Sequence, residues 1–337
     1  MRRLFDEGFP YGYFACVMAT GIVSIAARLE GLAWLSNGLF GLNLAQFSFW
    51  GAALVVWFCM APATAGAELL GSRGPGSLTL VAALCVLGDE MALATAYQTV
   101  VDIFCVAAGL LWVVAIYAIL ARATIRLRKP DGAAAIDGSW LLIVVATQGV
   151  AILSTHTSRA LELPDTALFV ALCLFLLGSA FYAVLITLIV ARWMFLPLRP
   201  EQFTAPYWIN MGAAAITTLA GTRLLAASDQ TPAMLPFREA ALAATVLFWT
   251  IASWWIPLLA MLTLWRYCRG VRPVYRIDNW AMVFPIGMYT AASWHVARDA
   301  GLPFLAPVSD VFIWLALAAW ALTFAGMIRS WAAAASV

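Results

Sequence analysis

The chain has 337 residues, of which 64% are hydrophobic and only 11% are charged, and its formal net charge is +2. A soluble domain carries about 25% charged residues, so this composition excludes an ordinary soluble globule. No basic stretch lies outside short loops, so we expect no nucleic-acid partner. The mean hydropathy of +0.91 and the 16 tryptophans indicate a polytopic membrane protein embedded in a lipid bilayer.

Ten segments are long and apolar enough to cross a bilayer, whose hydrocarbon core needs about 20 residues of helix. We therefore predict an all-α polytopic membrane protein that forms one transmembrane domain over residues 1–337. In the third segment, Asp89 and Glu90 interrupt the apolar pattern. The ten predicted spans begin near Pro10, Leu39, Ser77, Val100, Ser139, Ala167, Pro206, Phe237, Asn279 and Ser309.

The basic residues are distributed unevenly between the two sides of the predicted bundle. Most lie in the N-terminal segment, in the C-terminal segment or in the loops that follow even-numbered spans. By the positive-inside rule we place both termini in the cytoplasm of a multi-pass protein of the cell membrane, the inner membrane if the source is bacterial. The basic residues left for the opposite side are Arg28, Arg159, Arg223, Arg238 and Arg298.

The odd-numbered spans begin at similar intervals, which predicts five repeated helical hairpins. Even-numbered spans are strongly apolar or carry tryptophans near their middle, as in "FWTIASWWIPLL" (Phe248 to Leu259). Odd-numbered spans are smaller and more polar, and such residues face protein or water rather than lipid. We therefore expect five odd-numbered helices in an inner ring and five apolar helices outside it.

Seven small or polar residues of the first, fifth and seventh spans share helical faces and are candidates to line a pore. The alternative is ordinary helix packing, because small residues also let helices approach closely. The candidates are Thr20, Ser24, Thr147, Ser154, Asn210, Thr217 and Gly221.

The ninth span, "NWAMVFPIGMYTAASWHVA", has Pro285 and Gly287 near its middle. Proline removes a backbone donor and kinks a helix. Broken backbone at membrane depth is tolerated where protein or water satisfies it. Phe284, beside the predicted kink, either projects into a lumen as a hydrophobic gate or packs between helices.

The chain resembles the tellurite-resistance/dicarboxylate transporter family, which includes TehA, plant slow anion channels, the fungal malate permease and fungal sulfite exporters. The resemblance is carried by "GYFACVMATGIVSIA", "WLLIVVATQGVAIL", "PYWINMGAAAITTLAG", "FWTIASWWIPLL" and "WAMVFPIG", in this order along the chain. It implies ten transmembrane helices as five hairpins around a central pore, assembly as a homotrimer and a gating phenylalanine, which by position is Phe284.

Four arginines end odd-numbered spans on the outer side: Arg28, Arg159, Arg223 and Arg298. A ring of them at the outer mouth would concentrate anions, and the alternative is snorkelling at helix ends. Asp89 and Glu90 either lie in the pore and couple transport to protons or follow a span that ends at Gly88, which we prefer. His156 and His295 are expected to be ordinary interfacial residues.

We therefore expect a membrane channel or transporter that passes small inorganic or organic anions. The alternative is a proton-coupled C4-dicarboxylate carrier or a sulfite exporter. The sequence has no H-E-x-x-H motif and no intramembrane Ser–His or paired Asp arrangement, so we expect no enzyme activity. The six cysteines include no C-x-x-C pair, so we expect neither a metal site nor a cofactor.

Overall fold

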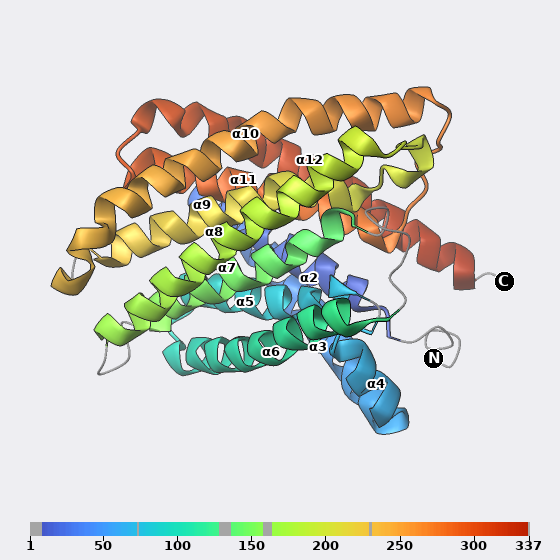
Figure 1. The fold of residues 1–337 in the computed structure, drawn as a ribbon, viewed down its shortest axis with the longest axis horizontal. Coiled ribbons are helices and arrows are strands. Elements are labelled where there is room, and N and C mark those ends of the chain that lie inside the picture. Colours follow the sequence, from blue (N-terminus) through green and yellow to red (C-terminus); the bar gives the residue numbers. More distant parts are fainter. Residues whose placement is uncertain (1–8, 73, 128–135, 158–163, 229–230, 336–337) are drawn as a thin grey trace.

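The computed structural model describes residues 9–72, 74–127, 136–157, 164–228 and 231–335, and every regular element in these ranges is helical. The α-helices are α2 (Phe14–Leu29), α3 (Ala33–Met60), α4 (Pro62–Leu69), α5 (Leu78–Ala94), α6 (Gln98–Ile125), α7 (Leu142–Thr157), α8 (Pro164–Phe195), α9 (Ile209–Ser228), α10 (Arg238–Cys268), α11 (Trp280–Asp299) and α12 (Ala306–Ala335). Figure 1 shows the long helices lying side by side as a bundle.

The long helices fall into two classes by burial. Within Gly138–Thr157, which includes α7, 89% of the most apolar stretch is buried, against 17% within Ala33–Met60, which is α3. Helices α2, α5, α9 and α11 resemble α7, whereas α6, α8, α10 and α12 resemble α3. The buried class contains the helices with small side chains, such as the run Gly212, Ala213, Ala214 in α9, and small side chains allow helices to approach closely.

The five buried helices contact one another in a closed cycle: α2 with α5, α5 with α7, α7 with α9, α9 with α11, and α11 with α2. Each of them is preceded by a short 3-10 turn, and these turns contact one another in the same cyclic order. The recurrence of turn and helix agrees with a repeated unit. The turns are η1 (Tyr11–Tyr13), η2 (Pro75–Ser77), η4 (Gly138–Leu141), η6 (Ala205–Trp208) and η8 (Ile277–Asn279).

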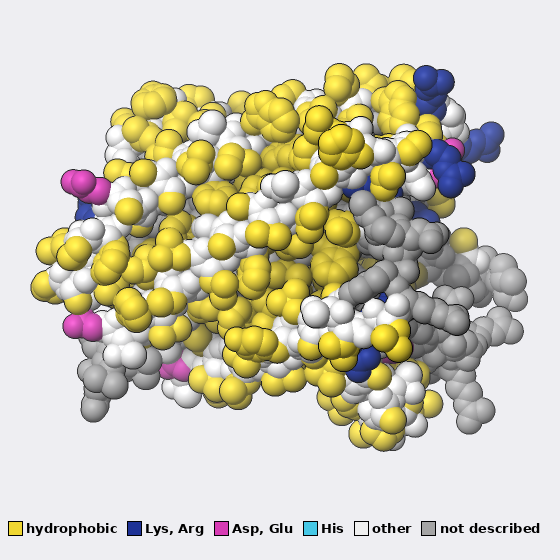
Figure 2. Space-filling model, in the orientation of Figure 1, with side chains coloured by type: hydrophobic (Ala, Val, Ile, Leu, Met, Phe, Trp, Pro, Cys, Tyr) yellow, Lys and Arg dark blue, Asp and Glu magenta, His cyan; other side chains and the backbone are white. Residues whose placement is uncertain are grey.

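The exposed helices cover the cycle from outside. Helix α3 packs on α2, α6 on α5 and α7, α8 on α7 and α9, α10 on α9, and α12 on α11 and α2. Their outward side chains are large and apolar, including Leu110, Val184 and Leu322. Figure 2 shows such side chains covering the middle of the molecule, as expected of a surface that faces lipid.

Each exposed helix also makes at least one polar bond to the buried helix that follows it in the cycle, and we name one for each. In three of these bonds a tryptophan indole N–H donates to a serine or threonine hydroxyl. Such bonds satisfy polar groups that would be costly to leave unpaired in an apolar surrounding. They run from Asn43 Nδ2 to Glu90 Oε2 (2.7 Å), Trp112 Nε1 to Thr147 Oγ1 (2.9 Å), Tyr182 Oη to the Asn210 carbonyl (3.0 Å), Trp249 Nε1 to Ser293 Oγ (3.0 Å) and Trp320 Nε1 to Thr20 Oγ1 (3.0 Å).

Eight helical segments of the described chain are long and apolar enough to cross a membrane. Helices α9 and α11 are not among them, because their composition is less apolar, although both are 20 residues long. Ten long helices appear at the places expected from the sequence, but α3 begins at Ala33 rather than near Leu39. The short helix α4 was not expected. The protein is thus a multi-pass, all-helical membrane protein.

The chain begins and ends at the same end of the bundle (Figure 1). Lys and Arg side chains gather at that end, whereas acidic side chains appear at the opposite end (Figure 2). The basic residues there include those at the ends of α6, α8 and α10 and in the segments that follow: Arg122, Arg126, Arg192, Arg199, Arg266, Arg269, Arg272 and Arg276. We refer to this end as the basic end and to the other as the acidic end.

Candidate functional site

A cavity lies inside the cycle of buried helices, and every one of the five contributes to its wall. It is small, with about 10 Å³ of space for a water-sized molecule. Ile22 and Ile25 come from α2, Cys85, Val86 and Asp89 from α5, Gly149 and Ile152 from α7, Ile216 and Leu219 from α9, and Met288 from α11. The wall is therefore apolar except for the carboxylate of Asp89.

Close helix contacts make this enclosure possible. A Cβ atom added at Gly149 would lie 2.9 Å from Cys85 Cβ, so α7 approaches α5 too closely for a larger residue. One added at Gly287 would lie 3.0 Å from Ile22 Cγ2, so α11 is similarly close to α2. The glycines of the ring therefore set the distances between neighbouring helices.

Phe284 lies one helical turn before Met288 in α11, towards the basic end. Residues four apart share a helical face, and Met288 lines the cavity, so Phe284 is on the same cavity-facing side. Its side chain is only 1% exposed. Pro285 is inside the continuous helix and faces α9, where a Cβ added at Gly212 would lie 2.7 Å from its Cγ.

None of the seven small or polar candidates for pore lining is in the cavity wall. Four of them face exposed helices instead. Thr20 accepts from Trp320 of α12, Ser24 donates to the Ser36 carbonyl of α3 (3.0 Å), Thr147 accepts from Trp112 of α6, and Ser154 lies 4.0 Å from Cys105 of α6. These contacts favour helix packing, the alternative left open for them.

The other three candidates are in α9. Thr217 donates to the Ala213 carbonyl of its own helix (2.8 Å). Asn210 is fully buried, and its carbonyl accepts from Tyr182 of α8. A Cβ added at Gly221 would collide with Thr245 of α10, so this glycine allows α10 to pack closely on α9.

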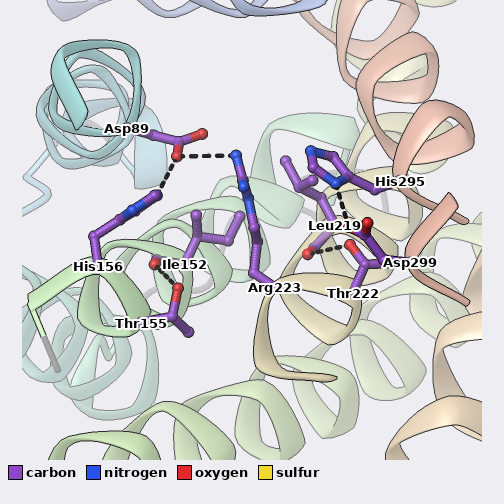
Figure 3. A network of polar contacts seen from close by, with 9 residues as sticks. All are labelled: Asp89, Ile152, Thr155, His156, Leu219, Thr222, Arg223, His295 and Asp299. Atoms are coloured by element: carbon purple, nitrogen blue, oxygen red, sulfur yellow. Dashed lines mark hydrogen bonds and ion pairs between the residues drawn. The ribbon is translucent and has the colours of Figure 1, made fainter. Parts of the chain in front are cut away.

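Asp89 is the centre of a polar network at the acidic end of the cavity. Its Oδ1 accepts from His156 Nε2 at 2.6 Å and lies 3.5 Å from Arg223 Nη2. A second pair, His295 Nδ1 and Asp299 Oδ2, is 2.5 Å apart on α11. Figure 3 shows Arg223 between His156 and His295, and the carboxylate of Asp89 faces both His156 and Arg223.

Periodicity places this network directly above the cavity. His156 is one turn beyond Ile152, and Arg223 is one turn beyond Leu219, so each lies on the face that lines the cavity. His295 is two turns beyond Met288 on the same face of α11. These side chains therefore lie between the cavity and the acidic end.

The preference for a third span that ends at Gly88 was wrong. Helix α5 continues to Ala94, and both acids are buried within it. Asp89 is stabilised by His156 and Arg223, while Glu90, on another face, accepts from Asn43 of α3. These partners lie far along the chain, so the local sequence did not reveal them.

His156 and His295 were expected to be ordinary interfacial residues, and each contacts a carboxylate, which that expectation did not include. A sequence pattern could have indicated this network: one ionisable residue lies near the outer end of each of several successive odd-numbered spans. Among the described cavity-forming helices, this set is Asp89, His156, Arg223 and His295.

The four arginines expected at the outer mouth have different surroundings. Arg28 donates to Asn37 Oδ1 (2.7 Å), and Arg298 stacks over the Trp294 ring, 4.0 Å from its centroid. Arg223 contacts Asp89 inside the cycle, and Arg159 lies outside the described residues. Of the three arginines in the described residues, only Arg223 contacts a residue of the cavity wall.

Within the described residues, no group of three His, Cys, Asp or Glu side chains is placed to hold a metal ion.

Comparison with known proteins places the chain among transport proteins. A profile of the family described as voltage-dependent anion channel matches residues 8–328. The family resemblance expected from the motifs is confirmed by this match.

Two related proteins are described as a membrane protein and as a transporter. An uncharacterized membrane protein of Mycobacterium tuberculosis is 37% identical over 153 residues, which cover 45% of this chain and 77% of the relative. An uncharacterized transporter of Methanocaldococcus jannaschii is 25% identical over 337 residues, which cover 94% of this chain and 93% of that protein.

Proposed function

This chain belongs to the voltage-dependent anion channel family, and from that premise we propose that it passes small anions through a central pore formed by α2, α5, α7, α9 and α11. The observation that carries the proposal is the cavity, whose wall takes residues from all five of these helices. In this arrangement α9 and α11 also cross the membrane, so one domain of ten spans forms five hairpins. The basic end, with both termini, faces the cytoplasm of the cell membrane.

The pore is closed at Phe284. A buried phenyl ring on the cavity-facing side of α11 leaves no space for water beside it, and a dewetted constriction is a barrier to ions. Two glycines let the neighbouring helices approach α11 near this ring. Gly212 allows α9 to pack against Pro285, and Gly287 allows α2 to pack against α11. Pro285 fixes the position of the ring by packing on Gly212.

The apolar wall favours weakly hydrated or transiently desolvated anions over strongly hydrated cations. Positive charge at the acidic end comes from Arg28, Arg223 and Arg298, and it raises the local concentration of anions. Thr20, Ser24, Thr147, Ser154, Asn210, Thr217 and Gly221 hold the pore helices in place rather than contacting the permeating ion.

Removal of the phenyl ring tests the gate. Phe284→Ala is expected to raise anion conductance per folded protein in planar bilayers, since a wetted gap replaces a dewetted one. Phe175→Ala is a matched control, because Phe175 is equally buried but contacts α9 at Gly221 from outside the cycle. If both variants conduct as wild type does, Phe284 is a packing residue and the gate lies elsewhere.

Homotrimeric assembly is proposed on the family resemblance alone. Native mass measurement of the protein released from lipid nanodiscs tests it, and a monomeric mass at all protein concentrations would refute it.

A second candidate is a proton-coupled carrier for C4-dicarboxylates or sulfite. The observation that favours it is the burial of two neighbouring acids, Asp89 and Glu90, in a pore helix. Intramembrane carboxylates are common in proton relays. Uptake of labelled malate or sulfite into vesicles, with and without an imposed proton gradient, separates a carrier from a channel. Transport that ignores the gradient rules out the carrier.

A further inference from the structure

The network at the acidic end contains donors that its own acids do not satisfy. Arg223 contacts Asp89 through one Nη2 atom at 3.5 Å, a longer distance than the 2.7–2.9 Å typical of a charge-assisted hydrogen bond. Its Nε is buried and has no hydrogen-bond partner within the described chain. Guanidinium has five N–H donors in a planar fork, so most of its binding capacity is unused.

His295 presents a second unused group at the same place. It is 4% exposed, its Nδ1 donates to Asp299, and its Nε2 has no partner among the described residues. This Nε2 donates to an anion when the ring is protonated, because both nitrogens of an imidazolium are donors. Figure 3 places His295 beside Arg223, on the side away from Asp89. Arg223 therefore stands between a carboxylate that only partly satisfies it and a buried imidazole nitrogen that is unsatisfied.

The position of Asp89 is the one that an anion would occupy. Its Oδ1 meets both His156 Nε2 and Arg223 Nη2, so one carboxylate oxygen accepts from two helices at once. Without Arg223 this carboxylate would repel every anion that approached the cavity. With Arg223 the charge at the entrance is balanced, and the stronger bond, at 2.6 Å, is to the histidine.

We propose that Arg223, with His295 beside it, forms an anion-binding subsite at the acidic end of the pore, and that the Asp89 carboxylate is a tethered competitor that an incoming anion displaces from Arg223. The ligand class is an oxyanion or carboxylate, because two coplanar oxygens can accept from the guanidinium fork together. Asp89 keeps its bond to His156 when the anion is bound. This inference deepens the proposed function, on which it rests.

The experiment uses nitrate as the probe and Phe284→Ala as the background, since that variant tests the proposed pore by itself. Conductance is measured against nitrate concentration for Phe284→Ala alone and combined with Asp89→Asn, Arg223→Gln or Asp102→Asn. Binding of nitrate to the corresponding variants with Phe284 intact is measured by titration calorimetry. Asp102→Asn is the matched control, because Asp102 is an acid at the same end that bonds to Gln98 of its own helix α6 rather than to a residue of the subsite.

Asp89→Asn removes the competing charge and keeps the shape, so it is expected to lower the nitrate concentration at half-saturation by roughly tenfold. Arg223→Gln is expected to raise that concentration by at least roughly tenfold, because the bidentate donor is lost. Asp102→Asn should change it by less than roughly twofold, since its charge lies on the exposed helix α6 and is screened there. Chloride, which cannot accept from the fork with two atoms, should respond less than nitrate to each change.

The outcomes separate failure of the proposed pore from failure of the subsite. If Phe284→Ala does not conduct, the proposed pore fails, and the calorimetric titrations still decide the subsite. If Asp89→Asn leaves both half-saturation and nitrate binding unchanged, or weakens them as Arg223→Gln does, the pair is structural and the subsite is overturned. Should either single variant fail to fold, the charge-balanced Asp89→Asn/Arg223→Gln variant replaces it. The subsite predicts nitrate binding weaker than wild type in that variant, and unchanged binding overturns it.

Discussion

Pro285 of α11 packs directly against Gly212 of α9. A Cβ atom added at Gly212 would lie 2.7 Å from Pro285 Cγ and 3.2 Å from Pro285 Cα. The proline ring is rigid, so neither side of this contact can move without moving a helix. The glycine thus supports the position of the neighbouring Phe284 from a helix more than 70 residues away in sequence.

The first prediction concerns this contact. Gly212→Ala should destabilise the protein by about 1–3 kcal/mol, the usual cost of overpacking, and should raise basal anion conductance because α11 is displaced. Thermal unfolding in detergent and bilayer conductance are the measurements. Gly109→Ala on α6 is the control, because its added Cβ meets nothing within 4 Å. Equal effects at both positions would mean that the contact with Pro285 is unimportant.

The second prediction concerns how the volume and position of the side chain at residue 284 affect conductance. Phe284→Leu should raise conductance less than Phe284→Ala does, because much of the side-chain volume remains. Pro285→Ala should keep the phenyl ring but move it, because the substitution restores a backbone donor and removes the contact with Gly212. Conductance should therefore change while the ring volume is constant. Single-channel recordings of the three variants check the order. Leucine conducting as much as alanine would show that bulk is not what closes the pore.

The sequence predicted the division into two helix classes, because apolar and polar compositions directly reflect contact with lipid or protein. It did not predict which side of each pore helix faces the cavity. Helical periodicity places Thr20 and Ser24 on one face, but only the neighbours decide whether that face meets a lumen or α12 and α3. Polar residues here pair with the exposed helices, while apolar Ile22 and Ile25 line the cavity.

The polar network at the acidic end could not be predicted from local patterns for a similar reason. Asp89 and Glu90 look like the end of a span when their partners are unknown. In the fold they receive His156, Arg223 and Asn43 from three other helices. Long-range contacts of this kind compensate the cost of burying charge, and they have no signature in a single segment.

The third prediction compares two arginines of the acidic end. Arg223→Gln should lower anion flux more than Arg298→Gln, because Arg223 contacts the cavity residue Asp89, whereas Arg298 stacks on Trp294. Any effect of Arg298→Gln should be confined to low ionic strength, since the Debye length is about 10 Å at 0.1 M salt. Anion efflux from vesicles at two ionic strengths is the test. A larger loss in Arg298→Gln would place the important charge at the rim.

The fourth prediction concerns the bond from Trp320 Nε1 of α12 to Thr20 Oγ1 of α2, which closes the cycle of bridges between exposed and buried helices. Thr20→Val should destabilise the protein more than Trp320→Phe, because it leaves the indole N–H without an acceptor in an apolar surrounding. Bonds between membrane helices are worth about 0.6 kcal/mol on average and at most about 1.7 kcal/mol. The double variant should therefore be close to Trp320→Phe in stability rather than the sum of the two.

Reversible unfolding in mixed micelles gives the free energies of unfolding of the wild type, the two single variants and the double variant. Trp314→Phe is the control for the loss of an indole, because Trp314 lies on the same helix and is 62% exposed. The loss of the bridge should also loosen α12 from α2 and so increase hydrogen exchange in α2, which Trp314→Phe should leave unchanged. Additive single effects, or equal exchange in all variants, would show that the bridge is only an incidental contact and that the apolar packing of α12 alone holds the cycle closed.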